Sequence, residues 1–410
     1  MNSTDANILI IFALTYAGLA MGRIPGLKVN RVGIALLGAI AMMIFGNVST
    51  ADAVEYVNVP TVALLFGFFV ISAQLRLSGF YDVVAGGIAA RLGHPARFLL
   101  VLMAVTGGLS AFLNHDIVCY VFTPIVANAL LRKQLNPVPF LIALAISSNI
   151  GSAATLIGNA QDMLIGQTAH LDFGRYMLWA SVPVLFAMAC AYGIAWFLSK
   201  NNLKLPEPVA VGTLEQPHPF NRRHTIKGLI ILIAVIGLFF SSIPTEIIAL
   251  AAAGIHLASH KFRTEDLLGL VEWPILVLFI GLFVVTGAFV STGLGDQGVK
   301  WLAHAGFNLN QPVNLTLSTA VLANLINNSP TVMLLLKVVT PLTTTSAYIL
   351  ALTNSFAGSL LVIGSVANII TVQQARDLGV KISFWDFTRL GFPITLAALA
   401  GLLCWVKLMS

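Results

Sequence analysis

Long apolar stretches recur from one end of this chain to the other, and several are long enough to cross a lipid bilayer. The runs at 59–75, 175–198, 273–292 and 388–407 approach or reach the roughly 20 residues that a spanning helix needs. Only 9% of the residues are charged and 58% are apolar, whereas a soluble domain has about 25% charged residues. We therefore predict an all-α, polytopic membrane protein with roughly ten to twelve spans.

The polar composition excludes several other classes. The net charge is +6, but the basic residues do not gather on one soluble face, so we expect no nucleic-acid partner. The three cysteines are Cys119, Cys190 and Cys404, and without a C-x-x-C spacing they form neither a disulfide framework nor a zinc site. We predict no cofactor and no resident metal. The sequence also lacks the H-E-x-x-H, P-loop and G-x-S-x-G motifs of hydrolases and ATP-driven pumps.

One hydrophilic segment lies near the middle of the chain. Residues 199–227 contain four prolines and five basic residues, and we expect them to form a cytoplasmic linker. This segment divides the chain into a first half, 1–198, and a second half, 228–410.

The distribution of basic residues suggests a topology, because short cytoplasmic loops carry an excess of lysine and arginine. We place 97–131 and 312–340 as re-entrant helical hairpins that enter from opposite faces, a choice made partly to maximise this asymmetry. With both termini outside, eighteen of the 22 basic residues then fall on the cytoplasmic side. The remaining four are Arg175, Lys300, Lys337 and Lys407.

The two halves then have the same order of elements in opposite orientations. Each contains spans, a re-entrant hairpin, a long interrupted helix (138–170 or 344–375) and a final span. Inverted repeats of this kind are typical of secondary transporters, whose substrate site lies at the bilayer midplane between broken helices.

Four polar motifs interrupt the hairpins and the long helices. They begin at Asn114, Ser147, Asn327 and Thr353. Non-helical backbone at bilayer depth is tolerated only where it is buried in protein or lines a wet cavity, and converging half-helices can present dipoles to a small polar solute. The alternative is that these small and polar residues only pack helix against helix.

We favour a binding site, because the motifs occur in two matched pairs. The predicted substrate contacts are Asn114, Ser148, Asn149, Gly151, Ser152, Thr155, Asn327, Asn328, Ser329, Thr331, Asn354, Ser355 and Gly358.

Two carboxylates fall at membrane depth in this topology, and each costs a few kcal/mol unless it is compensated. We predict that Asp116 carries the coupled proton, and that His115 either shares this proton or faces the lumen. Aligning Ile157-Gly158 with Ile363-Gly364 pairs Asp162 with Asn368 as a secondary coupling site. For Asp162 the alternative is a helix cap at the membrane interface.

The motifs, together with the stretch from Ser148 to Gly158, resemble the ion transporter superfamily. This superfamily includes ArsB-type arsenite permeases, NhaD-type sodium/proton antiporters and divalent anion/sodium symporters. The hairpin tips here are Asn114-His115-Asp116 and Asn327-Asn328-Ser329-Pro330-Thr331. They resemble the Asn-Asn-Asp and Asn-Asn-x-Pro-Thr tips of the ArsB branch more than the Ser-Asn-Thr tips of the symporters. His115 is a departure, since the ArsB pattern has asparagine there.

The resemblance implies an elevator-type carrier in a bacterial plasma membrane that exports arsenite or antimonite in exchange for protons. It also leaves room for an accessory ATPase. Cys119, one helical turn beyond Asp116, is expected to pack rather than to bind the metalloid. Gly18 and Gly22 form a G-x-x-x-G pattern on the first span, which is compatible with a homodimer.

Three alternatives remain. The same fold could exchange sodium for protons at Asp116. It could also transport a (di)carboxylate or another anion with sodium, although the four motifs contain no arginine or lysine. A different class is suggested by Gly293-Leu294-Gly295-Asp296 and Tyr81-Asp82, which match motifs of intramembrane aspartyl proteases. Our topology places Asp82 and Asp296 on opposite sides of the membrane, too far apart for a catalytic dyad.

Overall fold

The computed structural model describes residues 3–22, 28–90, 93–203, 219–258, 261–304 and 307–409, and these residues form helices throughout. The helices of the first half are α1 (Ser3–Met21), α2 (Arg31–Phe45), α3 (Thr50–Tyr56), α4 (Val59–Leu77), α5 (Phe80–Ala90), α6 (Pro95–Phe112), α7 (His115–Arg132), α8 (Val138–Ser152), α9 (Ala160–Thr168) and α10 (Phe173–Ser199). Those of the second half are α11 (Arg222–Leu238), α12 (Thr245–Leu257), α13 (Thr264–Gly269), α14 (Trp273–Ser291), α15 (Leu294–His304), α16 (Pro312–Ile326), α17 (Asn328–Val338), α18 (Thr344–Ala357), the 3₁₀ turn η1 (Val362–Gly364), α19 (Val366–Asp377) and α20 (Phe384–Met409).

Six of the described helices are long and apolar enough to cross a membrane: α1, α4, α6, α10, α14 and α20. Large apolar side chains remain exposed along several of them, for example Leu178 and Leu185 on α10. In a polytopic membrane protein such side chains face lipid, so the prediction of an all-helical membrane protein is confirmed.

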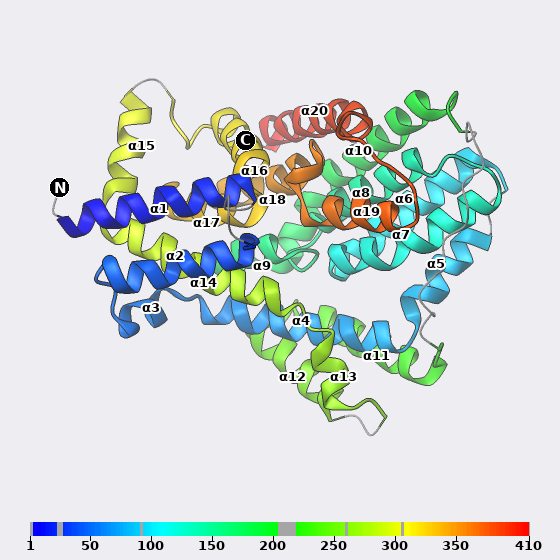
Figure 1. Ribbon diagram of the computed structural model, residues 1–410, viewed down its shortest axis with the longest axis horizontal. Helices are drawn as coiled ribbons and strands as arrows, with labels where there is room; N and C mark the ends of the chain where they lie inside the picture. Colours follow the sequence, from blue (N-terminus) through cyan, green and yellow to red (C-terminus); the bar gives the residue numbers. More distant parts are fainter. Residues whose placement is uncertain are drawn as a thin grey trace.

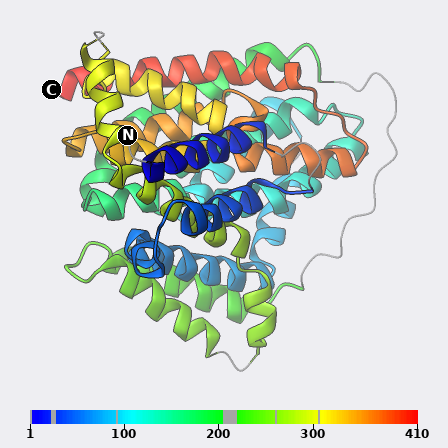
Figure 2. The same ribbon diagram turned by 60° about the vertical axis from the view of Figure 1, so that its left-hand side comes forward.

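The ten helices described before the central segment and the ten α-helices described after it correspond in order. Helices that pack on each other have counterparts that also pack on each other. α4 packs on α12 as α14 packs on α2. In the same way α6 packs on α8 as α16 packs on α18, and α7 packs on α19 as α17 packs on α9. The two halves therefore interleave, as the blue α2 and α4 lying beside the yellow-green α14 and α12 show (Figure 1 and Figure 2).

Two close helix contacts make this correspondence exact at the residue level. Added to Gly67 of α4, a Cβ would lie 2.7 Å from the backbone of Ala249 on α12. Added to Gly281 of α14, it would lie 3.0 Å from the backbone of Ala35 on α2. One shift of 214 residues along the chain relates both pairs. The same helix crossing is thus built twice.

Each half also contains a helix pair that reverses direction within the fold. The chain turns at Leu113 and Asn114 between α6 and α7, and at Asn327 between α16 and α17. Asn327 has φ +78°, a left-handed conformation in which asparagine is among the tolerated residues. In our topology these pairs are the two re-entrant hairpins, entering from opposite faces.

Basic residues gather at one end of the bundle. Backbone hydrogen bonds from Asn136 N to Leu203 O (2.8 Å) and from Asn221 N to Ser78 O (2.9 Å) join four of the segments in two pairs. These segments and their flanks carry Arg76, Arg132, Lys133, Lys200, Arg222 and Arg223. By the positive-inside rule this end is cytoplasmic in our topology. Much of the predicted linker, 204–218, lies outside the described residues.

Some local structure differs from the sequence expectations. The short helices α3, α5, α13 and α15 lie between the predicted spans and hairpins. The G-x-x-x-G pattern of the first span serves packing within the chain, because a Cβ on Gly18 would lie 3.1 Å from Ile34 of α2. The homodimer prediction therefore loses the motif on which it was based.

The close approach at Gly67 predicts that Gly67→Ala lowers the melting temperature of the detergent-solubilised protein. Overpacking of this kind costs about 1–3 kcal/mol. The matched control is Gly254→Ala on α12, where an added Cβ meets no atom within 4 Å. The control should be neutral or stabilising, because alanine favours helix more than glycine does. Equal melting temperatures for the two variants would contradict the proposed contact.

Candidate functional site

The two interrupted helices break at equivalent places. The first breaks between Ser152 and Ala160, and the second between Ala357 and Val366. In each break the chain folds back so tightly that a Cβ on Gly158 or Gly364 would meet the carbonyl oxygen six residues earlier. Glycine is required there because the backbones leave no room for a side chain.

The broken helices cross, and one set of hydrogen bonds joins α8 of the first half to the second break. The Nδ2 of Asn149 donates to Oδ1 of Asn368 at 2.8 Å, and Oγ of Ser365 donates to Oδ1 of Asn149 at 2.9 Å. All three residues are at most 2% exposed. Both amide atoms of Asn149 thus form hydrogen bonds with residues at the beginning of α19.

A second set joins α18 to the first break in the same way. The Oγ of Ser355 donates to Oδ2 of Asp162 at 3.4 Å, and Nδ2 of Asn159 donates to Ser355 Oγ at 3.2 Å. A shift of 206 residues along the chain superimposes the partners of one set on those of the other. The last turns of α8 therefore bind the second break, and the last turns of α18 bind the first break. Each repeat is held by a helix of the other.

Asp162 lies buried inside the helix bundle. Its side chain lies in the first turn of α9 and is 0% exposed. Asn159 caps this helix, because its Oδ1 accepts from Asp162 N at 2.8 Å. The N-cap of α9 is therefore Asn159, and Asp162 lies buried three residues further along.

Much of the first hairpin tip is committed to the fold. The Oδ1 of Asn114 accepts from the backbone N–H of Asp116 at 2.8 Å and so caps α7. Ser148 Oγ lies 2.6 Å from Ser110 Oγ and donates to the carbonyl of His115 at 3.2 Å. The hydroxyl group of Ser148 and the amide oxygen of Asn114 are therefore used within the fold.

The second tip is held by the breaks of both halves. Asn327 Nδ2 donates to Ile363 O at 3.3 Å, and Thr331 Oγ1 donates to Asn327 O at 2.8 Å. Ser329 Oγ accepts from Gln161 Nε2 of α9 at 2.7 Å. The tip therefore lies against the crossing, and the side chains of Asn327, Ser329 and Thr331 make hydrogen bonds there.

Four further predicted site residues bind backbone groups or allow close packing of the backbone. Ser152 Oγ donates to Asn149 O at 2.9 Å, and Thr155 Oγ1 donates to Ala111 O. Gly151 permits close contact with α6, and Gly358 permits the approach of Asn328, whose Nδ2 would lie 2.9 Å from a Cβ there. Their role in the structure is to position the tips and breaks.

The polar atoms that remain available are few. Among the described residues, buried atoms without a hydrogen-bond partner include Asn328 Oδ1, both amide atoms of Asn354, Thr353 Oγ1 and His115 Nδ1. Asp116 Oδ1 approaches His115 Nε2 at 3.5 Å. These atoms come from both tips and from α18, and a small hydroxylated solute could bind to such a set.

Sequence reasoning did not include Thr353, Asn159 or Ser365 among the predicted site residues, although Thr353 begins the fourth motif. The signal for Asn159 was its position three residues before Asp162, a common capping arrangement. Ser365 is its counterpart at the shift of 206 residues. Thr353 directly precedes Asn354 and carried no distinct signal.

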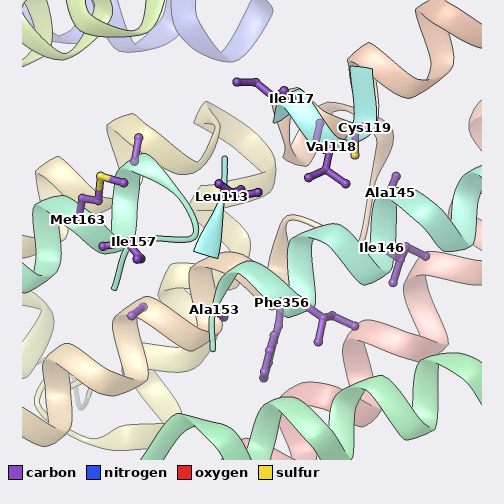
Figure 3. Close-up of a cluster of buried hydrophobic side chains, with 14 of the residues drawn as sticks. Leu113, Ile117, Val118, Cys119, Ala145, Ile146, Ala153, Ile157, Met163 and Phe356 are labelled. Atoms are coloured by element: carbon purple, nitrogen blue, oxygen red, sulfur yellow. The ribbon is translucent and has the colours of Figure 1, made fainter. Parts of the chain in front are cut away.

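Apolar side chains surround the crossing. Figure 3 shows Leu113 of the first tip near Ile157 of the break, with Phe356 of α18 close by. Cys119 is fully buried in this cluster, in keeping with a packing role. The apolar surroundings strengthen each polar contact inside them.

A cavity of about 590 Å³ lies beside the first break, toward the less basic end of the bundle. It is lined by Leu156 and Ile157 of the break and by Asp172 and Glu246. Gln167 of α9 borders it and donates to Thr245 Oγ1 at 2.8 Å and to Glu246 Oε2 at 3.3 Å. The cavity is thus a route by which solvent can approach the break.

The protease motifs are far apart. Figure 1 shows α5, which carries Asp82, and α15, which carries Asp296, at opposite ends of the molecule. The side chain of Asp296 lies outside the described residues. Two helices so placed cannot share a proton between their carboxylates, so the protease alternative is wrong.

Known proteins place the chain in a family. Residues 8–351 match the family model described as CitMHS, citrate transporter. The chain belongs to the CitMHS family. It is 30% identical over 414 residues to an uncharacterized transporter of Mycobacterium tuberculosis, covering 95% of each chain. It is also 26% identical to the silicon efflux transporter LSI3 of Oryza sativa, covering 92% of each.

Two solved transporters share the fold of this CitMHS member. The YdaH transporter of Alcanivorax borkumensis has a TM-score of 0.58 at 16% identity, with 100% of this chain and 98% of that chain covered. MtrF of Neisseria gonorrhoeae has a TM-score of 0.52 at 13% identity, with 99% and 94% covered. The chain is therefore a multi-pass membrane transporter of the ion transporter superfamily and not an enzyme. Its bacterial relatives suggest the plasma membrane.

The crossing predicts a large effect of Asn149→Ala. This change leaves Asn368 Oδ1 and Ser365 Oγ without a partner in a buried site, at about 1–3 kcal/mol for each group. We expect a lower melting temperature in detergent and no transport. The control, Asn310→Ala, removes an exposed amide that donates to Thr340 O and should change neither. A wild-type melting temperature for Asn149→Ala would show that the crossing does not depend on this amide.

Proposed function

We propose that this transporter exports a small uncharged hydroxylated solute, arsenite or antimonite, in exchange for protons. The observation that carries the proposal is the chemistry of the available atoms at the crossing. They are the amide oxygen of Asn328, the amide group of Asn354, the hydroxyl of Thr353, and the His115–Asp116 pair. Arsenite near pH 7 is a neutral trihydroxide, which suits amide and hydroxyl partners.

The absence of basic residues from the four motifs supports a neutral cargo. A carboxylate is usually recognised by arginine or lysine, although sodium ions could bridge a (di)carboxylate or another anion to the site. The family description as citrate transporter favours this second candidate. The similarity to a silicon efflux transporter favours export of an inorganic solute.

Asp116 is the proposed proton carrier, with His115 as its partner. The two lie at the N-terminus of α7, are 6% and 7% exposed, and are 3.5 Å apart. A buried carboxyl that alternately gains and loses a proton can couple that proton to movement of the cargo. Each proton moving down the membrane potential contributes about 2.3 kcal/mol per 100 mV. A neutral cargo can therefore be driven outward.

The packing between the tips and the surrounding spans supports an elevator-like movement. At the less basic end, α9 packs on α4 and α17 packs on α14. The mirror-related pairs, α19 with α14 and α7 with α4, do not pack to the same extent among the described residues. Two inverted halves that differ in this way correspond to one of two alternating states.

Uptake into everted membrane vesicles tests the cargo. We expect a proton gradient to drive arsenite uptake without sodium, because the proposed carrier binds protons and a neutral solute. Empty-vector vesicles are the control, with citrate as the competing cargo. Proton-driven citrate uptake, or strictly sodium-dependent transport that is indifferent to arsenite, would contradict the proposal. Sodium/proton exchange alone would favour antiport at Asp116.

The coupling role predicts that Asp116→Asn reaches the membrane but loses coupled transport by a factor of 100 or more. The amide keeps the shape of the carboxyl group but cannot exchange a proton. Glu265→Gln, on a side chain that is 74% exposed, is the matched control and should transport normally. Full activity of Asp116→Asn in the vesicle assay would remove the proposed carrier.

A further inference from the structure

The second break contains a complete hydrogen-bonding pattern around Asn368. Its Oδ1 accepts from Asn149 of the other half at 2.8 Å. Its Nδ2 donates to the carbonyl oxygens of Gly358 at 2.7 Å and Leu361 at 3.0 Å. The amide nitrogen therefore closes the break by satisfying two carbonyl groups that the interrupted helix leaves free.

The first break repeats this geometry with an acid in place of the amide. The shift of 206 residues carries Asn368 onto Asp162, and the two carbonyls onto those of Ser152 and Thr155. The turns agree as well: Ala153 N donates to Ile150 O, as Ser359 N donates to Phe356 O.

The two carboxyl oxygens of Asp162 are not equivalent. Oδ2 accepts from Asn159 Nδ2 at 2.6 Å and from Ser355 Oγ at 3.4 Å, so it corresponds to the amide oxygen of Asn368. Oδ1 is buried and has no hydrogen-bond partner among the described residues. By the shift of 206 residues it is the counterpart of Nδ2 of Asn368, which donates to two carbonyl groups in the other half.

We propose that Asp162 is a second proton site of the transporter, with its proton on Oδ1 and donated to the carbonyl groups of the first break. A protonated carboxyl group has one acceptor oxygen and one O–H donor, and so reproduces the amide of asparagine. An ionised carboxylate would direct a negative oxygen at carbonyl acceptors, without water to solvate it.

This second proton site rests on the proposed function, because it takes the proton as the coupling ion. It does not depend on which cargo is transported. Loss of the proton would set a negative oxygen of Asp162 against the carbonyls of its own break, while Oδ2 would remain an acceptor for Ser355. Proton release is thereby linked to rearrangement of the first break at the crossing. Asn368 cannot lose a proton, so this link exists in only one of the two halves.

Few ionisable groups on the packed elements face Asp162. α4, α17 and α18, which pack on α9, carry Arg76, Lys337 and Tyr348 as their ionisable side chains. Lys337 borders a cavity at the far end of α9. Tyr176 of α10 donates to Ala153 O at 2.9 Å. None of these groups supplies Oδ1 with a donor among the described residues.

Thermal unfolding in detergent between pH 5 and 9 tests the site without any cargo. The native state holds the proton, so its contribution is present at low pH and is lost as pH rises through the titration of Asp162. We expect the melting temperature of wild type to fall with rising pH, and Asp162→Asn to lose this fall. Asp116→Asn should keep it, and Asp162→Asn combined with Asn368→Asp should restore it from the mirror position.

Two results would overturn the proposal. One is a pH profile of Asp162→Asn parallel to that of wild type. The other is stabilisation of wild type by sodium chloride, relative to choline chloride, that Asp162→Asn loses, since this would assign the site to a cation. If Asp162→Asn does not fold, infrared spectroscopy of Asp116→Asn at pH 7 decides. A protonated carboxyl band shielded from deuterium exchange supports the site, and its absence contradicts it. Failure of arsenite transport would leave these results unaffected.

Discussion

Every peptide group freed by a broken helix must find a partner inside the bilayer, because lipid offers none. In this transporter the two breaks satisfy that requirement for each other. Asn149 of the first half and Ser355 of the second bind the beginning of the opposite half-helix. The hairpin tips pack on this crossing, and the surrounding spans enclose it. If the reciprocal bonds were removed, neither tip would keep its position.

The two repeats agree in backbone and differ in the chemistry placed on it. The second tip is tied to the surrounding spans, because Tyr16 OH donates to Pro330 O at 3.3 Å and lies 3.1 Å from Thr286 Oγ1. The first tip carries His115 and Asp116 instead, and isoleucine replaces tyrosine at position 230, the counterpart of Tyr16 at the shift of 214 residues. The shared backbone of the two repeats thus forms the site, and the side chains that differ between them give the two halves different roles.

The positions of the breaks could be predicted from sequence, because Gly, Ser and Asn are costly inside apolar helices unless the chain turns there. The distribution of basic residues and the shared order of elements predicted the inverted relation of the halves, and the alignment of Gly158 with Gly364 paired Asp162 with Asn368. The sequence could not distinguish polar side chains that bind solute from those that bind the backbone. Asn114 and Asn328 occupy equivalent tips, yet the first caps its helix while the second keeps a free oxygen. That difference depends on three-dimensional contacts that no local pattern encodes.

The central claim is that the cargo binds at the crossing of the two broken helices. The most direct test is to locate arsenic by anomalous X-ray scattering in crystals of the transporter grown with arsenite. The account predicts one arsenic peak between the two tips, within hydrogen-bonding reach of Asn328 and Asn354. A peak confined to the cavity beside Asp172 and Glu246, or no ordered arsenic in a transport-competent protein, would contradict it.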